Sequence, residues 1–385
     1  MSRTGPPAAK RRRKNIEIAR SEQQQTKNLM DLNDECLLKI FRYLKRSGDL
    51  GKVEKVCKRF AEFAEYAFVL DNGGARMGYS GNYGYEHTEK MLRIIGRHIS
   101  SLSIWDFHYG RKTWNKILLL VQEYCAKLKK LQIKGFIDRS LFSQLKPLFK
   151  RLEKLSLHCG SLRSSDLDIM NNLKALNVSA GVDMLLRGFS PIKLTKMQEM
   201  SFHDASKIDD ASMIHIIKLT TNLKKLSISG ANNLTTAVFD AIGQLKELEE
   251  LEFLNPYMKT SENFQDDLMH LTSLCKLKIL KFNCAKQTLY PLLEGLSTNG
   301  FALIELELHN GSPNDRVFES ICKIKTLKKL NLFYMNGLKD EHILEIAKEL
   351  KLLSDIFIRI SPSLSQLGLR SLKPNSKCQL TISTW

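Results

Sequence analysis

The residues best suited to chemistry are histidines and cysteines, and one adjacent pair, His158 and Cys159, combines a base with a nucleophile. This segment has the pattern of a strand, and successive side chains of a strand point to opposite faces. The two groups therefore cannot act on each other. None of the nine histidines stands at metal-ligand spacing from another histidine or a cysteine, so we expect no metal site.

Motifs that bind nucleotides or build hydrolases are also missing from the sequence. It contains no GxxxxGK(S/T), HExxH or GxSxG segment, and the glycines at 78, 81 and 84 do not form a GxGxxG fingerprint. The eight cysteines form no CxxC pair, which indicates small buried thiols in a reducing compartment rather than a zinc site. We therefore expect a non-catalytic protein without cofactors.

The charge of the chain is strongly positive, with a formal net charge of +18 over 385 residues. Residues 1–30 carry eight Lys or Arg against two Asp or Glu, including five consecutive basic residues at 10–14. We expect this arm to be disordered, because it has too little apolar surface to fold. The basic run is either a nuclear-import signal or a solvated tail. Without an apolar stretch typical of a membrane span or secretory signal, we expect the nucleus or the cytoplasm, or both.

The elements that could position a binding site begin with a helical segment at residues 32–68. Leu37, Ile40, Phe41 and Leu44 follow helical spacing, and Asn33 or Asp34 can cap the helix. We expect a second helix from residue 49 to about residue 60 and a third through residue 68. The first helix is apolar around most of its circumference, so it must be buried on more than one side. It packs either on the rest of the chain or on another protein.

The order of residues in this segment resembles the F-box motif. The resemblance rests on Leu-x-x-Glu-x-Leu-Leu-x-Ile-Phe-x-Tyr-Leu at 32–44, Asp-Leu at 49–50 and Val-Cys-Lys-Arg-Phe at 56–60. Asn33 stands where the family usually has proline, and Phe60 replaces a frequent tryptophan. The F-box is a three-helix unit that binds the Skp adaptor of a cullin-based ubiquitin ligase. The resemblance implies that six residues contact this adaptor: Leu32, Leu38, Ile40, Leu44, Leu50 and Val56. The alternative is that 32–68 merely caps the next domain.

From residue 98 to the C-terminus an apolar pattern recurs every 21 to 29 residues. Its central positions, which we term the anchors, are Leu102, Leu131, Leu155, Leu176, Met200, Leu226, Leu251, Leu280, Leu306, Leu330, Ile356 and Leu380. This period is typical of leucine-rich repeats, in which a short strand is followed by a helix. We therefore predict an α/β fold: an F-box at 31–70, a connector at 71–97 that is irregular at 71–85, and a curved leucine-rich-repeat solenoid of about 12 repeats at 98–385.

In such a solenoid the residues one before, one after and three after each anchor face the hollow side. This surface would be basic in the early repeats and acidic in the middle, with aromatic residues at both ends. Exposed aromatics and arginines dominate protein interfaces. Our candidates for binding a target protein are Trp105, Lys130, Lys134, Lys154, Phe333, Phe357 and Arg359. For any one of them, a simple solvated strand residue is the competing interpretation.

The F-box resemblance implies a substrate-recognition subunit of a Skp–cullin–F-box ubiquitin ligase. Such a subunit holds a target protein on its repeats for ubiquitination and proteasomal degradation, and performs no bond chemistry itself. The alternative is a repeat scaffold that binds RNA or chromatin through its basic surface. Binding to phosphates would weaken steeply as salt is raised.

Overall fold

The structure of the protein is a computed structural model. It describes residues 28–383, apart from 48–49, 54, 72–73, 79–84, 106–109, 159, 164–165, 167, 180–181, 186–193, 205, 207, 256–262, 284–288, 301, 310–313, 336, 360–363 and 365–378. The predicted basic arm lies outside the described residues up to position 27. The chain forms two compact units, residues 1–72 and 73–385.

The first unit is a small group of helices. It comprises the short 3-10 helix η1 (Leu29–Asp31), α2 (Asp34–Ser47), α3 (Leu50–Val53), α4 (Lys58–Val69) and the two-residue strand β1 (Leu70–Asp71). Asn33 caps α2, because its Oδ1 accepts a hydrogen bond from the N–H of Cys36 at 2.8 Å. The helices α2 and α4 pack through Phe41 and Phe60, whose ring centroids lie 5.2 Å apart. The three expected helices are therefore present.

The second helix is much shorter than we expected. It ends at Val53, whereas our prediction continued it to about residue 60. Cys57 has an extended backbone and caps α4 instead, with its Sγ accepting a hydrogen bond from the N–H of Phe60 at 3.4 Å. Phe60 therefore belongs to the third helix, and Val56 lies in the turn that precedes it.

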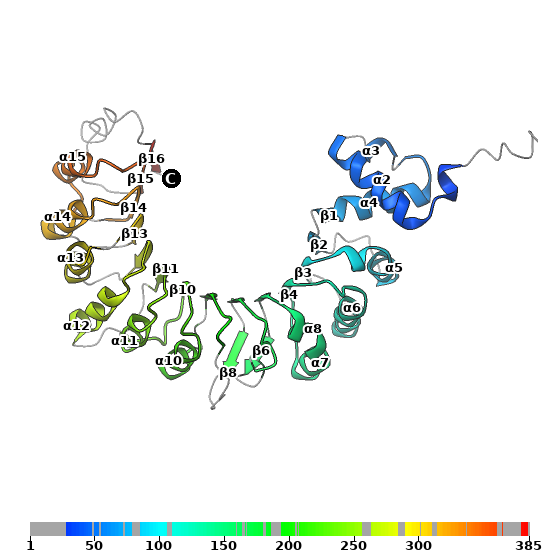
Figure 1. Cartoon of the computed structure of the whole chain (residues 1–385), viewed down its shortest axis with the longest axis horizontal. Coiled ribbons are helices and arrows are strands. Elements are labelled where there is room, and N and C mark those ends of the chain that lie inside the picture. Colours follow the sequence, from blue (N-terminus) through cyan, green and yellow to red (C-terminus); the bar gives the residue numbers. More distant parts are fainter. Residues whose placement is uncertain are drawn as a thin grey trace, which may run out of the picture. The chain divides into compact units, whose positions relative to one another are not determined.

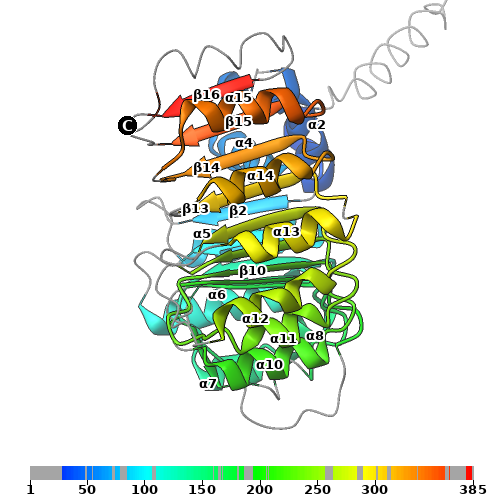
Figure 2. The same cartoon turned by 90° about the vertical axis from the view of Figure 1, so that its left-hand side faces the viewer.

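The second unit is built on one parallel sheet with helices along its outer side (Figures 1 and 2). Its strands, in the order in which they pair, are β2 (Gly74–Gly78), β3 (Ser101–Trp105), β4 (Lys130–Lys134), β5 (Lys154–Leu157), β7 (Ala175–Val178), β9 (Glu199–His203), β10 (Lys225–Ser229), β11 (Glu250–Leu254), β12 (Ile279–Asn283), β13 (Glu305–His309), β14 (Lys329–Phe333), β15 (Asp355–Arg359) and β16 (Gln379–Ser383).

The outer elements return the chain from one strand to the next. They are α5 (Tyr85–Ile95), η2 (Gly96–His98), α6 (Arg111–Tyr124), α7 (Arg139–Gln144), α8 (Lys146–Arg151), α10 (Asp210–Leu219), α11 (Val238–Gly243), α12 (Phe264–Met269), η3 (His270–Ser273), α13 (Tyr290–Thr298), α14 (Asp315–Lys323) and α15 (Asp340–Glu349). Helices are wider than strands, so the repeats curve with the strands on the concave side, as Figure 1 shows for this unit. Among the described helices, none is both long and apolar enough to cross a membrane.

The predicted anchors form one continuous row across this sheet. Each pairs with the anchor of the next strand, from Leu102 opposite Leu131 to Ile356 opposite Leu380. Leu102 to Ile356 are all at most 2% exposed. The anchors therefore build one interior shared by neighbouring repeats, and the leucine-rich-repeat prediction is confirmed.

Residues 71–97 contain regular structure where we expected a connector. They contain β2 and α5, and Ala75 pairs with Leu102 in the same register as the anchors. Ala75 thus extends the anchor row by one strand. The sequence pattern missed this repeat because alanine stands at its anchor and glycines occupy both ends of the strand.

Two repeats also contain a second strand. The strands β6 (Gly160–Arg163) and β8 (Val182–Leu185) follow β5 and β7 and pair with each other in a separate parallel sheet. Figure 1 shows them on the outer side, where other repeats carry helices. The spacing from Leu155 to Leu176 is the shortest between anchors.

Candidate functional site

Helix α2 carries apolar side chains on two sides. On one side Leu37, Leu38 and Phe41 are at most 3% exposed and form the core of the first unit. Cys36, Ile40 and Tyr43 follow helical spacing along another side. Tyr43 is 73% exposed, Cys36 is exposed and Ile40 is half-buried. The described chain therefore leaves an apolar strip of α2 uncovered.

The six residues predicted to contact an adaptor have different environments. Leu32, Ile40 and Leu44 are half-buried, and Val56 is 65% exposed. Leu38 is only 3% exposed, so it supports the core of the unit and does not face a partner. The side chain of Leu50 lies outside the part of the chain that the structure describes. We define the F-box face as Cys36, Ile40, Tyr43, Leu44 and Val56.

Arg59 is a residue of this unit whose role the sequence did not reveal. Its guanidinium donates hydrogen bonds to the carbonyl of Met30, to the carbonyl of Leu32 at 2.8 Å and to Asp34 Oδ1 at 2.9 Å. It thereby ties the start of α4 to the start of α2. In the sequence Arg59 stands out only as part of the F-box-like motif. Its carbonyl partners, Met30 and Leu32, lie more than 25 positions earlier in the chain, so the sequence does not show these contacts.

The concave side of the second unit holds the other predicted site residues. At its N-terminal end Trp105 and Lys134 are register partners on β3 and β4. Lys130 and Lys134 are exposed, and Trp105 is half-buried. Lys154 is different, because its Nζ lies 2.9 Å from a carboxylate oxygen of Glu199. The predicted basic cluster therefore contains two exposed lysines and one that is neutralised.

A row of polar side chains crosses the strands beside these lysines. Ser103 donates to Gln132 Oε1 at 2.8 Å, and Gln132 Nε2 lies 3.1 Å from His158 Nε2. On its other side His158 Nδ1 lies 2.5 Å from Ser179 Oγ. Partial burial and the nearby positive charge of Lys134 lower the pKa of His158. The imidazole is therefore mainly neutral at pH 7, and its two nitrogens contact Gln132 on one side and Ser179 on the other.

The C-terminal end of the concave side is aromatic. His309 stacks on Phe333 with ring centroids 4.3 Å apart, and the Phe333 and Phe357 rings lie 5.1 Å apart. The Arg359 guanidinium lies over the ring of Tyr334 at 5.6 Å. Phe333 and Arg359 are register partners on β14 and β15. These three predicted residues, Phe333, Phe357 and Arg359, are thus brought together.

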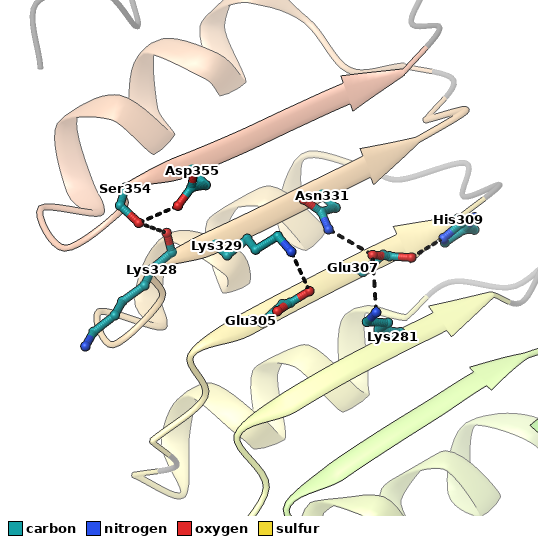
Figure 3. A network of polar contacts seen from close by, with 9 residues as sticks. All are labelled: Lys281, Glu305, Glu307, His309, Lys328, Lys329, Asn331, Ser354 and Asp355. Atoms are coloured by element: carbon teal, nitrogen blue, oxygen red, sulfur yellow. Dashed lines mark hydrogen bonds and ion pairs between the residues drawn. The ribbon is translucent and has the colours of Figure 1, made fainter. Parts of the chain in front are cut away.

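Carboxylates with nearby cations lie next to this aromatic group. Figure 3 shows Glu307 with three partners: His309 at 2.7 Å, Asn331 at 2.8 Å and Lys281 at 4.0 Å. Burial would raise the pKa of Glu307, but these partners outweigh it and lower the pKa. On the neighbouring strand Lys329 Nζ lies 3.1 Å from Glu305. These contacts link β12, β13 and β14.

The predicted target-binding residues therefore form two groups and not one site. Eight strand-to-strand steps separate β4 from β14 in the sheet order, which is roughly 40 Å along the sheet. A compact ligand could not touch both groups. Only an extended segment or a folded domain seated along the repeats could do so.

The described cysteines differ in their burial. Burial raises the pKa of Cys125 and of Cys322 to about 12, so both thiols stay protonated. Cys36 and Cys275 are exposed, so our expectation of buried thiols was wrong for these two. Cys159, which stands beside His158, lies outside the described residues. In the described part of the chain no group of three His, Cys, Asp or Glu could hold a metal ion.

Comparison with known proteins supports this architecture. The family model described as F-box-like matches residues 31–69, and none of the curated proteins matches the chain. A chain from the crystal structure of the Rad7 and Elc1 complex in yeast is 16% identical, with a TM-score of 0.60 and 98% of each chain covered. An internalin from Listeria monocytogenes is 17% identical over 77% of this chain and 76% of its own, with a TM-score of 0.45. The chain therefore joins an F-box-like segment at residues 31–69 to a solenoid of leucine-rich repeats.

Proposed function

We propose that this protein is a substrate receptor of a Skp–cullin–F-box ubiquitin ligase. Its F-box face binds the adaptor, and the concave side of its repeats holds a target protein for ubiquitination and proteasomal degradation. The observation that carries the proposal is that α2 is apolar on two sides, only one of which the described residues cover. Tyr43 and Val56 are 73% and 65% exposed on this small unit.

An uncovered apolar strip on so small a unit favours a partner. Each large apolar side chain that becomes buried contributes about 1.5–3 kcal/mol. Tyrosine also provides a hydroxyl that can reach a polar group at the rim of an interface. The ties that Arg59 makes from α4 to Met30, Leu32 and Asp34 hold the start of α2 in place. The strip is therefore presented on a rigid helix, which reduces the entropy lost on binding.

In this proposal the chain makes and breaks no covalent bond. Its contribution is to hold a target near a ubiquitin-charged enzyme carried elsewhere in the assembly, which raises the effective concentration of target lysines. A solenoid suits this task because its strands present a long concave surface.

The adaptor itself could be of more than one kind. The F-box resemblance indicates a Skp adaptor, whereas Rad7, which occurs in the structure that this chain resembles at 16% identity, was crystallised with Elc1. Both proteins can be purified and offered to the same preparation. Binding of either one supports an adaptor-docking role, and the preferred one identifies the ligase class.

The test is a double substitution on the F-box face, Tyr43→Asp with Val56→Asp. Both side chains are mainly exposed, so the unit should still fold, while two buried apolar contacts would be replaced by charges. We expect the Kd for the adaptor to rise by at least about 100-fold. The matched control is Leu344→Asp with Leu352→Asp in the second unit, where the side chains are 52% and 56% exposed.

Calorimetry with each adaptor, together with circular dichroism of each variant, completes the experiment. The proposal requires tight binding by the wild type and by the control variant, and weak binding by the F-box-face variant. If neither adaptor binds the wild-type chain, or if the F-box-face variant binds as well as the wild type, the docking role is wrong.

A further inference from the structure

The lysines of the concave strands differ in whether they have an acidic partner. The strands from β3 to β15 contain six: Lys130, Lys134, Lys154, Lys225, Lys281 and Lys329. The last four each lie within 4.0 Å of a glutamate, which is Glu199, Glu250, Glu307 and Glu305 respectively. Among the described residues, Lys130 and Lys134 have no such partner.

These two lysines lie on the same side of one strand. They are the first and last residues of β4, both are exposed, and Gln132 lies between them on the same face. Four strand residues span about 13 Å. The concave positions of β3, β5 and β7 contain no carboxylate among the described residues, so the positive charge of β4 is not offset by its neighbours.

The surroundings of Lys130 and Lys134 suit an anionic group of a protein. Gln132 is held by Ser103 and His158 and is therefore a fixed polar group between the two ammonium groups. Trp105, the register partner of Lys134, provides an aromatic surface for an adjoining apolar residue. We define the β4 site as Trp105, Lys130, Gln132 and Lys134.

The charge of the remaining concave strands argues against a nucleic acid. From β11 onward the concave positions carry five carboxylates, Glu250, Glu252, Glu305, Glu307 and Asp355, against Lys281, Lys329 and Arg359. A polyanion that followed the concave side would meet net negative charge within a few strands. A protein segment can be acidic at one end and neutral or basic at the other, so it can match both halves.

We infer that the β4 site binds oxyanion groups, carboxylate or phosphate, on a segment of the target protein. This inference rests on the proposed function for the identity of the ligand as a target. Two oxyanions about 13 Å apart would reach Lys130 and Lys134 together. The distant aromatic group at Phe333 and Phe357 is not required for this contact.

The test uses short fluorescein-labelled peptides added to the full-length chain. One peptide carries two phosphoserines four residues apart in a serine- and glycine-rich sequence. Two others carry glutamate or unmodified serine at the same positions, and a single-stranded RNA of similar length serves as the fourth probe. Fluorescence anisotropy at two salt concentrations measures each affinity.

The decisive variant is Lys130→Glu with Lys134→Glu, and its matched control is Lys146→Glu with Lys150→Glu. The control pair lies on the outer helix α8 with the same sequence spacing, and both lysines are exposed. We expect the wild type and the control to bind an anionic peptide on the order of tenfold more tightly than the β4 variant, because charge-assisted contacts are lost. Comparison of the phosphoserine and glutamate peptides identifies which oxyanion is preferred.

Three results would overturn the inference: no anionic peptide binds, both double variants lose binding equally, or the RNA binds more tightly than any peptide and depends on the same two lysines. Adaptor binding, measured on the same preparations, separates the two claims. If the chain binds its adaptor but the wild type binds no anionic peptide, only the β4 site is refuted. If the chain binds an anionic peptide but binds neither adaptor, only the proposed adaptor-docking function is refuted.

Discussion

Lys154 on β5 reaches across β7 to Glu199 on β9, with 2.9 Å between Nζ and the carboxylate. The two residues share one row of the sheet, and the residue between them in register is Ala175. The small side chain of Ala175 does not block the Lys154 side chain, so an ion pair forms between β5 and β9, which are not adjacent in the sheet. This pair decides where the basic surface of the concave side ends.

Removal of the Glu199 charge should extend the β4 site. In Glu199→Gln the Lys154 ammonium loses its partner and becomes available to a bound anion. We expect an anionic peptide to bind a few times more tightly, which corresponds to one added ion pair of roughly 0.5–1 kcal/mol. Fluorescence anisotropy measures this change. Glu250→Gln, which releases Lys225 farther along the sheet, is the control and should have less effect.

The cap of α7 should contribute measurably to stability. Asp138 Oδ1 accepts a hydrogen bond from the N–H of Leu141 at 2.8 Å, and Arg111 Nη2 lies 2.6 Å from Oδ2. We expect Asp138→Ala to lower the free energy of unfolding by about 1 kcal/mol at pH 7. Hydrogen exchange of the α7 amides and thermal melting measure this loss. Unchanged exchange in α7 would mean that the cap is dispensable.

The contribution of Asp138 should also depend on pH. The hydrogen bond from Leu141 and the nearby Arg111 lower the pKa of Asp138 in the folded chain. The folded state therefore favours the ionised carboxylate, and its stabilisation is present above the unfolded pKa. As pH falls through the folded pKa this stabilisation disappears. The difference in melting temperature between wild type and Asp138→Ala should shrink in acid, whereas a constant difference would contradict the ionic origin.

The close approach of α11 to the next repeat requires glycine at 243. A Cβ atom at this position would collide with the carbonyl oxygen of His270 and lie 3.1 Å from Ser273 Oγ. Alanine favours helices, yet we expect Gly243→Ala to destabilise the chain by about 1–3 kcal/mol. Chemical denaturation measures this effect. At Gly110, the N-cap of α6, a Cβ would meet nothing within 4 Å, so Gly110→Ala should cost about 1 kcal/mol at most, through the weaker cap alone.

The half-buried His158 should make the chain less stable in mild acid. Burial, Lys134 and His203 lower its pKa below the ordinary value of 6.5. Below about pH 6.5 the unfolded state binds a proton that the folded state resists, so stability falls as pH falls. His158→Gln should flatten this dependence between about pH 7 and pH 5.5, as thermal melting would show. An imidazole that titrates above 6.5 by NMR would contradict the argument.

The repeat register and the F-box segment were predictable because both depend on local periodicity. Apolar residues at alternate positions of a strand must share a face, so each anchor identified its strand before any contact was known. The same reasoning applied to α2, because helical spacing placed Leu37 and Phe41 together and left other apolar residues elsewhere on its circumference. The F-box resemblance then led us to predict that an adaptor protein covers the remaining residues.

Other features depended on contacts between residues far apart in the chain. Leu38 and Tyr43 are both apolar residues of one helix, but only the packing of α4 determines that the first is 3% exposed and the second 73%. Lys130, Lys134 and Lys154 look equivalent in the sequence, and only the open path over Ala175 lets Glu199 neutralise the third. The repeat at Ala75 was hidden because a small residue gives no periodic signal.

The amino-acid sequence by itself determined the repeat register and the two-sided apolar helix, because these follow from spacing along a regular backbone. Only the tertiary structure decided which apolar side chains remain exposed and which lysines lack an acidic partner. Exposure and ion pairing depend on residues that the packing of helices and the register of strands bring together. These residues are far apart in the sequence, so the sequence alone does not show that they are neighbours.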